Sequence, residues 1–458
     1  MATNVLIEIP GATDSPFEAH AEAASSLDVA GAQLDTALSS LGLEGIRVDP
    51  LTAPVPMFLS HRPEDAAANR DVVGGLESFG VEANAAAPSN ASIVVAAEVT
   101  DARLDELRSR KDVIVWANSE LVLLGNGPAA AAGHVDCRPF RNGVTIDEIR
   151  RVLGVKAAWD EGFKGSGIVV GIIDEGVNGE NYPVTGGFSR PASALQPGAA
   201  AIKSHGSMCA ADILIAAPEA KIFDYPFLGV PRSGGALQMF QAVLDQRRKD
   251  GTPHITNNSY GFVGIPPKEE MPEHEIHDIN HPVHRKILEV VAAGVACFFA
   301  AGNCGADCPS GKCHISGIGP GKSIHASNSL AEVITIAAVN SGDERIGYSS
   351  QGPGMFEQRK PDLACFSHMF GNFGPGRPGG TPPDFDNGTS AATPVAVGVA
   401  AMLLSAFNNV APAQLKSSLI QTARKVGGAT AWNADFGHGV IDADKAFQLL
   451  KEQVPAVG

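Results

Sequence analysis

Positive charge is scarce in this sequence. Lys and Arg together number 34 against 50 Asp and Glu, so the 458 residues carry a formal net charge of −16. An acidic chain of this kind repels phosphate groups, which argues against a nucleic acid or an anionic membrane as its partner. Apolar runs of membrane-spanning length without charge, Pro or Gly are also missing, and we therefore expect no transmembrane helix.

Cysteine is rare as well, with seven residues in the chain. An odd number of cysteines at uneven spacing does not predict a disulfide framework. The opening stretch, MATNVLIEIPGATDSPFE, has no basic segment followed by an apolar core, so we recognise no secretory signal peptide. These absences predict a cytoplasmic location by default, while export by another route stays open.

The N-terminal part of the chain has the pattern of a small domain. Residues 1–125 follow the order strand, helix, extended region, strand, helix, strand, which suits a ferredoxin-like α+β domain. Its helices are expected at residues 17–41 and 100–110. Residues 126–138, with many small side chains, are typical of a linker.

Residues 139–453 alternate between apolar strand-like runs and helical patterns. Continuous apolar runs such as GVACFFAA, residues 294–301, match strands that are buried on both faces. The alternation predicts an α/β domain with a parallel sheet and helices on both of its faces. Ligands bind such sheets at the carboxyl ends of the strands.

A serine precedes a nearly polar-free stretch of this domain. No charged residue occurs between Ser390 and Phe407, and the pattern predicts a helix that is buried on all sides. Pro394 fits the first turn of such a helix, where a missing N–H costs little. Ser390 would then lie near unpaired N–H groups and the positive end of the helix dipole, which suits a nucleophile. The alternative is that Thr389 or Ser390 acts only as an N-cap.

Three more polar side chains are expected near that serine. Asp174 and Asn303 each follow a buried strand, and His205 begins a helical pattern. Such a set suits acyl transfer, because an imidazole can take the serine proton, a carboxylate can fix the imidazole, and an amide can stabilise the oxyanion. Each residue alone also fits an ordinary structural role.

The segments around these four residues resemble the motifs of subtilisin-family serine peptidases. In chain order they are VVGIIDEGV, SHGSMCAADI, NNSYG, FFAAGNCG and DNGTSAATPVAVGVAAML, and weaker similarity spans residues 139–450. The order Asp, His, Ser is also the one that the family uses. The resemblance implies a subtilisin-like α/β fold, with a parallel sheet flanked by helices, and a serine endopeptidase that works through an acyl-enzyme.

The resemblance also implies a role for each matching residue. Ser390 would be the nucleophile, His205 the general base and acid, and Asp174 the residue that orients His205. The side-chain amide of Asn303 and the backbone N–H of Ser390 would form the oxyanion hole. The strip Ser259, Tyr260 and Gly261 would pair with the backbone of a peptide or protein substrate. The chemistry requires no cofactor, and structural calcium is expected from the family without assigned ligands.

Residues 92–124 resemble the second half of the inhibitory propeptide of this family. This implies that the N-terminal domain is an intramolecular inhibitor and folding assistant, and that the chain cuts itself within residues 120–138. An accessory domain that stays attached is the alternative. Two other functions also remain open: a dedicated processing peptidase or transpeptidase acting on one partner peptide, and a self-inhibited protein that binds without catalysis.

The cysteines near the predicted site invite separate hypotheses. Cys209 lies four residues after His205, so both would share one helix face. It resembles the free cysteine under the catalytic histidine of proteinase-K-like members, and we expect mercurials to inhibit the protein. Cys304, Cys308 and Cys313 have a spacing that favours one disulfide or free thiols, with zinc as the weaker alternative.

Two acidic features complete the expectations. Residues 266–285 contain four histidines among several carboxylates and are expected to form a solvated loop, with metal binding as the weaker alternative. Glu175, directly after Asp174, either deepens the negative potential of the site and favours basic substrates, or is a solvated carboxylate without a role.

Overall fold

The structure, a computed structural model, describes residues 2–10, 34, 38–39, 41–43, 46–57, 92–124, 136–137, 143–190, 193, 195–227, 231–370, 386–426, 428 and 431–454. It contains two compact units. The first comprises Met1–Leu121, Gly229–Thr252 and Pro267–Ala293, and the second Val122–Leu228, Pro253–Pro266 and Gly294–Gly458. Most of the helix expected at 17–41 and of the linker at 126–138 lies outside the described residues. The expected domain boundaries stay a prediction.

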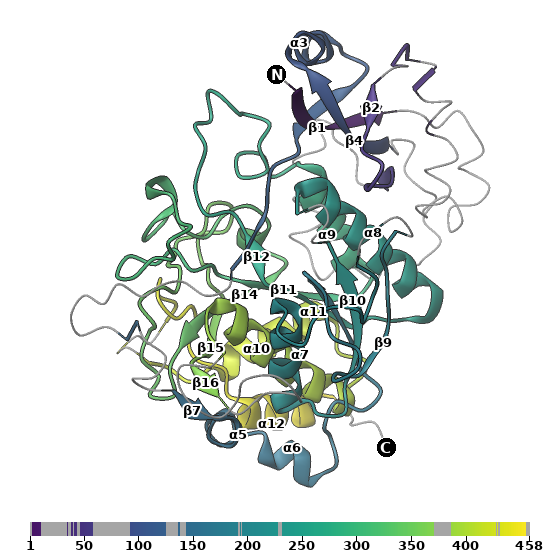
Figure 1. Cartoon of the computed structure of the whole chain (residues 1–458). Coiled ribbons are helices and arrows are strands. Elements are labelled where there is room, and N and C mark those ends of the chain that lie inside the picture. The colour runs from purple at the N-terminus through teal and green to yellow at the C-terminus, as the bar shows by residue number, and fades with distance from the viewer. Residues whose placement is uncertain are drawn as a thin grey trace. The chain divides into compact units, whose positions relative to one another are not determined.

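A parallel sheet of seven strands forms the centre of the second unit, in the order β15-β14-β13-β11-β8-β10-β9 (Figure 1). The strands are β8 (Val169–Asp174), β9 (Val184–Gly187), β10 (Lys221–Pro226), β11 (Ile255–Asn258), β13 (Ala296–Ala300), β14 (Ile334–Val339) and β15 (Leu363–Phe366). Every pair of neighbours runs parallel, which confirms the α/β fold predicted from the sequence. Since β10 and β11 lie on opposite sides of β8, the strand order reverses there, and such a point is where these sheets bind ligands.

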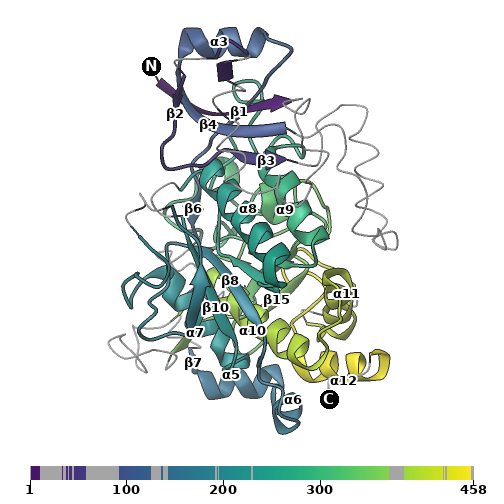
Figure 2. The ribbon, with the colours of Figure 1, turned by 90° about the vertical axis from the view of Figure 1, so that its right-hand side faces the viewer.

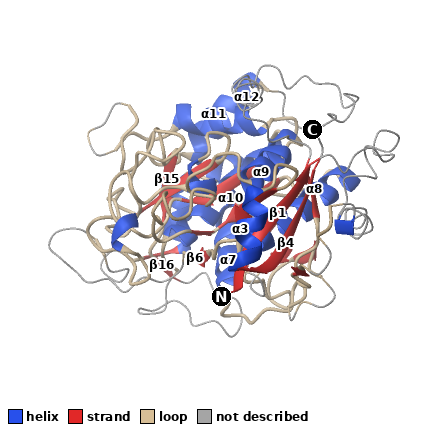
Figure 3. Ribbon diagram, turned by 90° about the horizontal axis from the view of Figure 1, so that it is seen from above, coloured by secondary structure: helices blue, strands red, loops and turns tan. Residues whose placement is uncertain are grey.

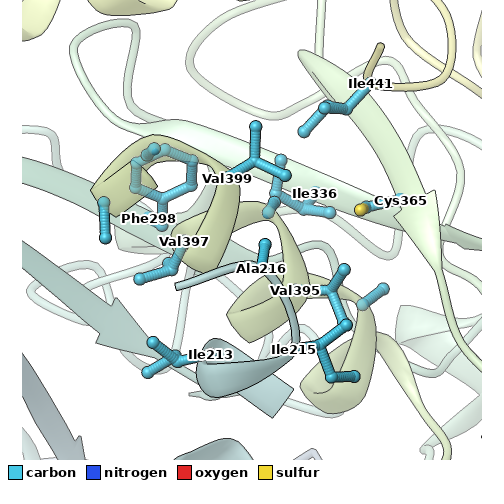
Figure 4. Close-up of a cluster of buried hydrophobic side chains, with 14 of the residues drawn as sticks. Ile213, Ile215, Ala216, Phe298, Ile336, Cys365, Val395, Val397, Val399 and Ile441 are labelled. Atoms are coloured by element: carbon cyan, nitrogen blue, oxygen red, sulfur yellow. The ribbon is translucent and has the colours of Figure 1, made fainter. Parts of the chain in front are cut away.

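Two apolar helices, α7 (His205–Ala216) and α10 (Thr389–Ala406), lie side by side against this sheet (Figures 1 and 3). A Cβ on Gly398 would lie 2.3 Å from the backbone oxygen of Ile213, so only glycine allows this close approach. Figure 4 shows Val395, Val397 and Val399 of α10 among side chains of α7 and of the strands. In the part of the chain that the structure describes, α10 alone is long and apolar enough to cross a membrane, but 94% of it is buried as the core helix of this unit.

Shorter elements complete the second unit. Its remaining helices are α5 (Ile146–Leu153), α6 (Lys156–Asp160), α11 (Pro412–Thr422) and α12 (Ala443–Gln453), with 3-10 turns at Ile315–Gly317 and Ala326–Ser329. Two pairs of short strands lie outside the main sheet: β7 (Val144–Thr145) with β16 (Met369–Phe370), and β6 (Val122–Leu123) with β12 (Tyr260–Gly261).

The first unit contains an antiparallel sheet in the order β2-β4-β1-β5, with β3 also paired to β4. Its strands are β1 (Ala2–Pro10), β2 (Arg47–Val48), β3 (Val55–Met57), β4 (Ser92–Thr100) and β5 (Ile114–Ala117), and the helix α3 (Asp101–Ser109) joins β4 to β5. The two longest strands, β1 and β4, are adjacent at the centre of this sheet, and the helix α3 follows β4, which suits a ferredoxin-like domain. The predicted helix at 100–110 is confirmed, and Thr100 caps it by accepting the N–H of Arg103.

Helices α8 (Ser233–Asp250) and α9 (Pro282–Ala292) lie on the opposite side of this sheet from α3 (Figure 2). Side chains of β1 alternate between the two sides, as a strand requires. Val5, Ile7 and Ile9 belong to the core shared with α3. Glu8 points the other way and binds the guanidinium of Arg285 on α9 at 2.6 Å, so the sheet and α9 share a buried ion pair.

The prediction of a solvated loop at residues 266–285 is wrong for His274, Glu275, His281 and His284. These side chains are almost fully buried: His274 5%, Glu275 2%, His281 0% and His284 0% exposed. Ser233 donates a 2.9 Å hydrogen bond to Glu275, which satisfies part of the buried carboxylate. Burial lowers the pKa of His281 to about 4, despite the nearby Glu275 carboxylate. A neutral imidazole can therefore stay inside the protein at physiological pH.

Candidate active site

A carboxylate and an imidazole meet at the end of the central strand. Asp174 is the last residue of β8 and is fully buried, and His205 is the first residue of α7. The Nδ1 atom of His205 lies 2.8 and 2.9 Å from the two carboxylate oxygens of Asp174. This contact fixes the orientation of the ring and directs its other nitrogen, Nε2, away from the carboxylate.

The pKa of His205 reflects two opposing causes. Burial of the ring acts to lower the pKa, but the Asp174 carboxylate outweighs it and raises the pKa of His205 above its usual value. Among the described residues, none forms a hydrogen bond with Nε2, although this atom is buried. The imidazole is therefore held as a base with one free nitrogen, as a proton acceptor requires.

The start of α7 depends on three local contacts. Ser204 caps the helix by accepting the N–H of Ser207. The carboxylate of Glu175 accepts the backbone N–H of His205, so it satisfies one of the N–H groups left open at the helix start. This contact gives Glu175 a structural role and corrects the alternative of a solvated carboxylate without one. A Cβ on Gly206 would lie 2.4 Å from the oxygen of Gly176, so the close approach of the helix requires glycine.

Ser390 is the second residue of α10, and its surroundings correct two expectations. The N-cap of α10 is Gly388, so neither Thr389 nor Ser390 caps this helix. Pro394 is the sixth residue and lies beyond the first turn. Because proline has no N–H, it cannot donate to the carbonyl of Ser390 four residues earlier. That carbonyl instead lies 3.5 Å from Cys209 Sγ and 3.5 Å from Ser259 Oγ, both of which can donate to it.

Asn303 is held in place by the start of α10. Its side-chain oxygen accepts hydrogen bonds from the N–H and the hydroxyl of Thr389, each at 2.9 Å. The amide nitrogen is thereby turned outward and donates to the backbone oxygen of Leu124. The hydroxyl of Ser390 donates to the same oxygen at 2.7 Å. One peptide carbonyl thus lies between the side chain of Asn303 and that of Ser390.

A short strand of the chain itself occupies the predicted substrate strip. β6 pairs antiparallel with β12, so that Leu123 lies opposite Tyr260 and Val122 opposite Gly261. The N–H of Leu124 also donates to the oxygen of Ser259 at 3.1 Å. Sequence reasoning gave residues 120–138 without selecting Leu124. The available signal was the apolar strand ELVLL, which stops at a glycine.

Of the three cysteines around Asn303, Cys304 and Cys313 form a disulfide, which confirms the alternative of one disulfide within this cluster. Cys308 forms a second disulfide, with Cys137, which was not expected. The second bridge uses a partner 171 residues away, which local spacing cannot indicate. Paired cysteines have no thiolate to offer a metal, so the zinc alternative for this cluster is wrong.

One group of side chains has the geometry of a metal site in the described part of the chain. The ligand atoms of Asp174, His205 and Cys209 lie within 4.8 Å of one another. The hydrogen bonds between Asp174 and His205 already use the nitrogen and the oxygens that would face an ion. Burial, together with the Asp174 carboxylate, raises the pKa of Cys209 well above its usual value, so the sulfur stays a thiol. This chemistry does not fit a metal site, and the expected structural calcium stays a prediction.

Comparisons with known proteins identify relatives of this chain. A family model for the subtilase family matches residues 165–439. Alkaline elastase YaB from Bacillus sp. strain YaB is 25% identical over 299 residues, or 63% of this chain and 67% of that protein. Serine protease AprX from Bacillus subtilis strain 168 is 24% identical over 396 residues, or 76% of this chain and 78% of that protein.

A solved structure shows the same fold over nearly the whole chain. Fervidolysin from Fervidobacterium pennivorans, described as a keratinolytic enzyme related to subtilisin, matches with a TM-score of 0.60 at 18% identity. The match covers 98% of this chain and 61% of fervidolysin. This chain therefore spans about three fifths of that protein, and the likeness concerns the fold.

Proposed function

This chain belongs to the subtilase family of serine peptidases, and we propose that it is an endopeptidase whose triad is Ser390, His205 and Asp174. The matched family model supports the reaction class, so its substrates are peptides or proteins. The observation that carries the assignment of the nucleophile and the oxyanion donor is the arrangement of the two side chains that hold one peptide carbonyl, Ser390 and Asn303. In an acyl transfer, the carbonyl under attack occupies this position. The Asp174–His205 contact supports the other two members of the triad.

The proposed reaction assigns one role to each of these residues. Ser390 Oγ attacks the substrate carbonyl while Nε2 of His205 takes its proton. Asp174 holds the opposite ring nitrogen and stabilises the imidazolium that forms. The amide of Asn303 donates to the developing oxyanion, with the backbone N–H of Ser390 as the second proposed donor. His205 then gives its proton to the leaving amine, and water releases the acyl group by the reverse sequence.

We further propose that the chain cleaves itself at the bond between Leu124 and Gly125. The support is that the carbonyl bound by Ser390 and Asn303 is that of Leu124, and that β6 lies on the substrate strip as an added strand. The N-terminal domain would then leave its own C-terminal end in the site and act as an intramolecular inhibitor.

Mass spectrometry of the purified chain tests the triad and the bond together. We expect a product that begins at Gly125 and a fragment that ends at Leu124, whereas Ser390→Ala should remain an uncut chain of 458 residues. Ser405→Ala is the matched control, because Ser405 lies on the same helix and hydrogen-bonds only near its far end, with Met402 and Gly165. Cleavage of Ser390→Ala at the normal rate would contradict the triad, and a different new N-terminus would contradict the bond.

Two alternatives share this geometry and need separate assays. A dedicated processing enzyme or transpeptidase would leave a panel of denatured proteins uncut, whereas a general endopeptidase would digest many of them. The occupied site also fits a protein that binds without turning over. A fluorophosphonate probe distinguishes it, because labelling of Ser390 in the cut form indicates a competent nucleophile and failure in both forms indicates a binding protein.

The cytoplasmic location expected from the sequence stays a prediction, and the cysteine pairing is an argument against it. Disulfides persist mainly in oxidising compartments. Titration of the denatured, unreduced protein should find three thiols, those of Cys209, Cys297 and Cys365, with the other four cysteines paired. Seven alkylated cysteines in protein isolated under alkylating conditions would support a reducing compartment.

A further inference from the structure

A narrow cavity beside Leu124 has a disulfide in its wall. Its lining includes Leu124, Val263 and Ser310, together with the disulfide-bonded pair Cys304–Cys313. Leu124 is 4% exposed, whereas the preceding Val122 and Leu123 are half-buried. The side chain before the proposed scissile bond is therefore the one that the protein encloses.

The bridge closes a loop that folds back on Asn303. The N–H of Ser310 donates to the backbone oxygen of Asn303 at 2.8 Å, and the sulfur of Cys313 lies 3.4 Å from the same oxygen. At the far end of the loop, the N–H of His314 donates to the oxygen of Val263 at 2.7 Å. The loop 304–313 is thus tied at one end to Asn303, which is proposed to bind the substrate carbonyl, and it continues directly into His314, which is tied to Val263 in the lining of the cavity.

The cavity that Leu124 helps to line is very small. About 10 Å³ of open space remains beside Leu124. This is at the lower limit of what one water molecule needs, on the order of 10–15 Å³. An aromatic side chain in the same position would have to move the loop outward. Because the Cys304–Cys313 bridge spans only nine residues and is tied to Asn303, that movement is opposed by a covalent bond.

We propose that the Cys304–Cys313 disulfide determines the size of the residue accepted before the scissile bond. In the oxidised protein the bridge holds the wall closed and restricts this residue to leucine or smaller side chains. Reduction by a dithiol transfers two electrons and two protons to the bridge, gives two thiols and leaves the dithiol as a disulfide. The loop can then open and accept aromatic residues. This inference rests on the proposed peptidase function.

The second disulfide makes a clean test possible. In the double variant Cys137→Ser with Cys308→Ser, the Cys304–Cys313 bridge is the one disulfide that remains among the described cysteines, so dithiothreitol acts on it alone. We would measure kcat and KM, per active site titrated with fluorophosphonate, on peptides that differ only in Leu or Phe before the cleaved bond. A difference in side-chain size such as that between Leu and Phe changes kcat/KM by about tenfold or more when the side chain binds in a hydrophobic pocket.

The expected result is a change in selectivity and not a general loss. Before reduction, the variant and the wild type should both prefer Leu to Phe by about tenfold or more. After reduction, the Phe-to-Leu ratio of kcat/KM should rise by about tenfold, through a lower KM for the Phe peptide, and return on reoxidation. Cys304→Ser with Cys313→Ser should show the raised ratio without dithiothreitol and no response to it.

Three outcomes would overturn the inference or its premise. An unchanged Phe-to-Leu ratio after verified reduction refutes the role of the bridge while leaving the peptidase intact. Loss of both hydrolysis and fluorophosphonate labelling on reduction shows that the bridge is only structural, which also refutes it. Absence of hydrolysis and labelling in the oxidised wild type refutes the proposed function itself.

Discussion

The hydroxyl of Ser390 donates a 2.7 Å hydrogen bond to the backbone oxygen of Leu124, 266 residues earlier in the chain. The amide of Asn303 donates to the same oxygen. A peptide carbonyl held by these two groups lies where a substrate carbonyl is expected to be attacked. The relationship gives a geometric basis for Ser390 as the proposed nucleophile and for the proposed cut after Leu124.

The buried position of Leu124 predicts that self-cleavage depends on its side chain. Leu124→Lys would place an ammonium group in an apolar cavity that already has Lys312 in its lining. Burial of an unpaired charge is costly, so conversion of the precursor should slow by on the order of 100-fold or more. Gel analysis of precursor conversion over time measures this. Leu123→Lys, at a half-buried position one residue earlier, is the matched control and should be cut at close to the normal rate.

The Asp174–His205 contact predicts the pH dependence of activity. Hydrolysis needs neutral His205, and since Asp174 raises its pKa, activity should rise with pH around a midpoint above 6.5. Asp174→Asn should reduce kcat on the order of 10⁴-fold and shift the midpoint of the remaining activity to lower pH. The control Glu175→Gln keeps an acceptor for the His205 N–H and should stay within a few-fold of the wild type. A pH–rate profile of Asp174→Asn that matches the wild type would disprove the assignment.

The buried Glu8–Arg285 pair predicts that removing one of its partners alone strongly destabilises the first unit. Both side chains are nearly unexposed, at 1% and 3%, and Glu8 also accepts hydrogen bonds from Ser92 and Trp116. Burial acts to raise the pKa of Glu8, but Arg285 and these donors outweigh it and lower the pKa. Arg285→Met leaves the carboxylate without its cation and should reduce the free energy of unfolding by about 3–5 kcal/mol.

Urea unfolding of the uncut Ser390→Ala chain measures that loss. Adding Glu8→Gln to Arg285→Met should recover part of it, because no buried charge is then left alone. The exposed pair Arg47–Glu98 in the same unit is the comparison, and Arg47→Met should change stability little. Equal effects of Arg285→Met and Arg47→Met would show that the buried pair has no special role.

Asp224 predicts a loss of stability as pH rises. This fully buried residue of β10 accepts the N–H groups of Val177 and Gly198 with one oxygen, and its other oxygen has no hydrogen-bond partner among the described residues. Burial raises the pKa of Asp224 to about 7, in spite of these two hydrogen bonds and with a further contribution from Asp174. The folded state therefore binds more protons than the unfolded state between about pH 4 and pH 7.

The substitution Asp224→Asn tests this, because the amide keeps an acceptor and does not titrate. The free energy of unfolding of Asp224→Asn, relative to that of the parent, should increase by up to about 1.4 kcal/mol per pH unit as pH rises from about 4 to about 7, and then level off. The difference between the two melting temperatures should follow the same course. Thermal unfolding of both proteins in the Ser390→Ala background gives the comparison. Parallel curves across this range would show that Asp224 is already ionised in the folded protein at low pH.

Cys209 predicts slow inhibition by mercurials. Its sulfur lies 3.9 Å from an Asp174 oxygen and 3.5 Å from the Ser390 carbonyl, so a bound mercury atom would displace the triad. Because burial keeps the thiol protonated, the reaction should be slow. Cys209→Ala should resist the reagent, while Cys297→Ala should remain as sensitive as the wild type. Full activity with Cys209 stoichiometrically mercurated refutes the hypothesis.

The sequence by itself determined the parallel sheet, the buried helix α10 and the four candidate residues. The reason is local: continuous apolar runs mark strands covered on both faces, and the carboxyl ends of parallel strands meet at one edge of a sheet. Asp174 and Asn303, which follow two strands of this sheet, were therefore expected at the same edge once the fold class was known. The helix beginning at His205 and the helix that follows Gly388 were expected to start at the same edge.

Only the tertiary structure decided which distant segments meet. Leu124 was one residue in a broad candidate region, and its contact with Ser390 depends on the path of β6 along β12. The pairing of Cys137 with Cys308 and the burial of His281 likewise depend on distances between segments far apart in the chain. Composition and spacing indicate what a segment can form, whereas its partner is selected by packing against the rest of the protein, which no local pattern encodes.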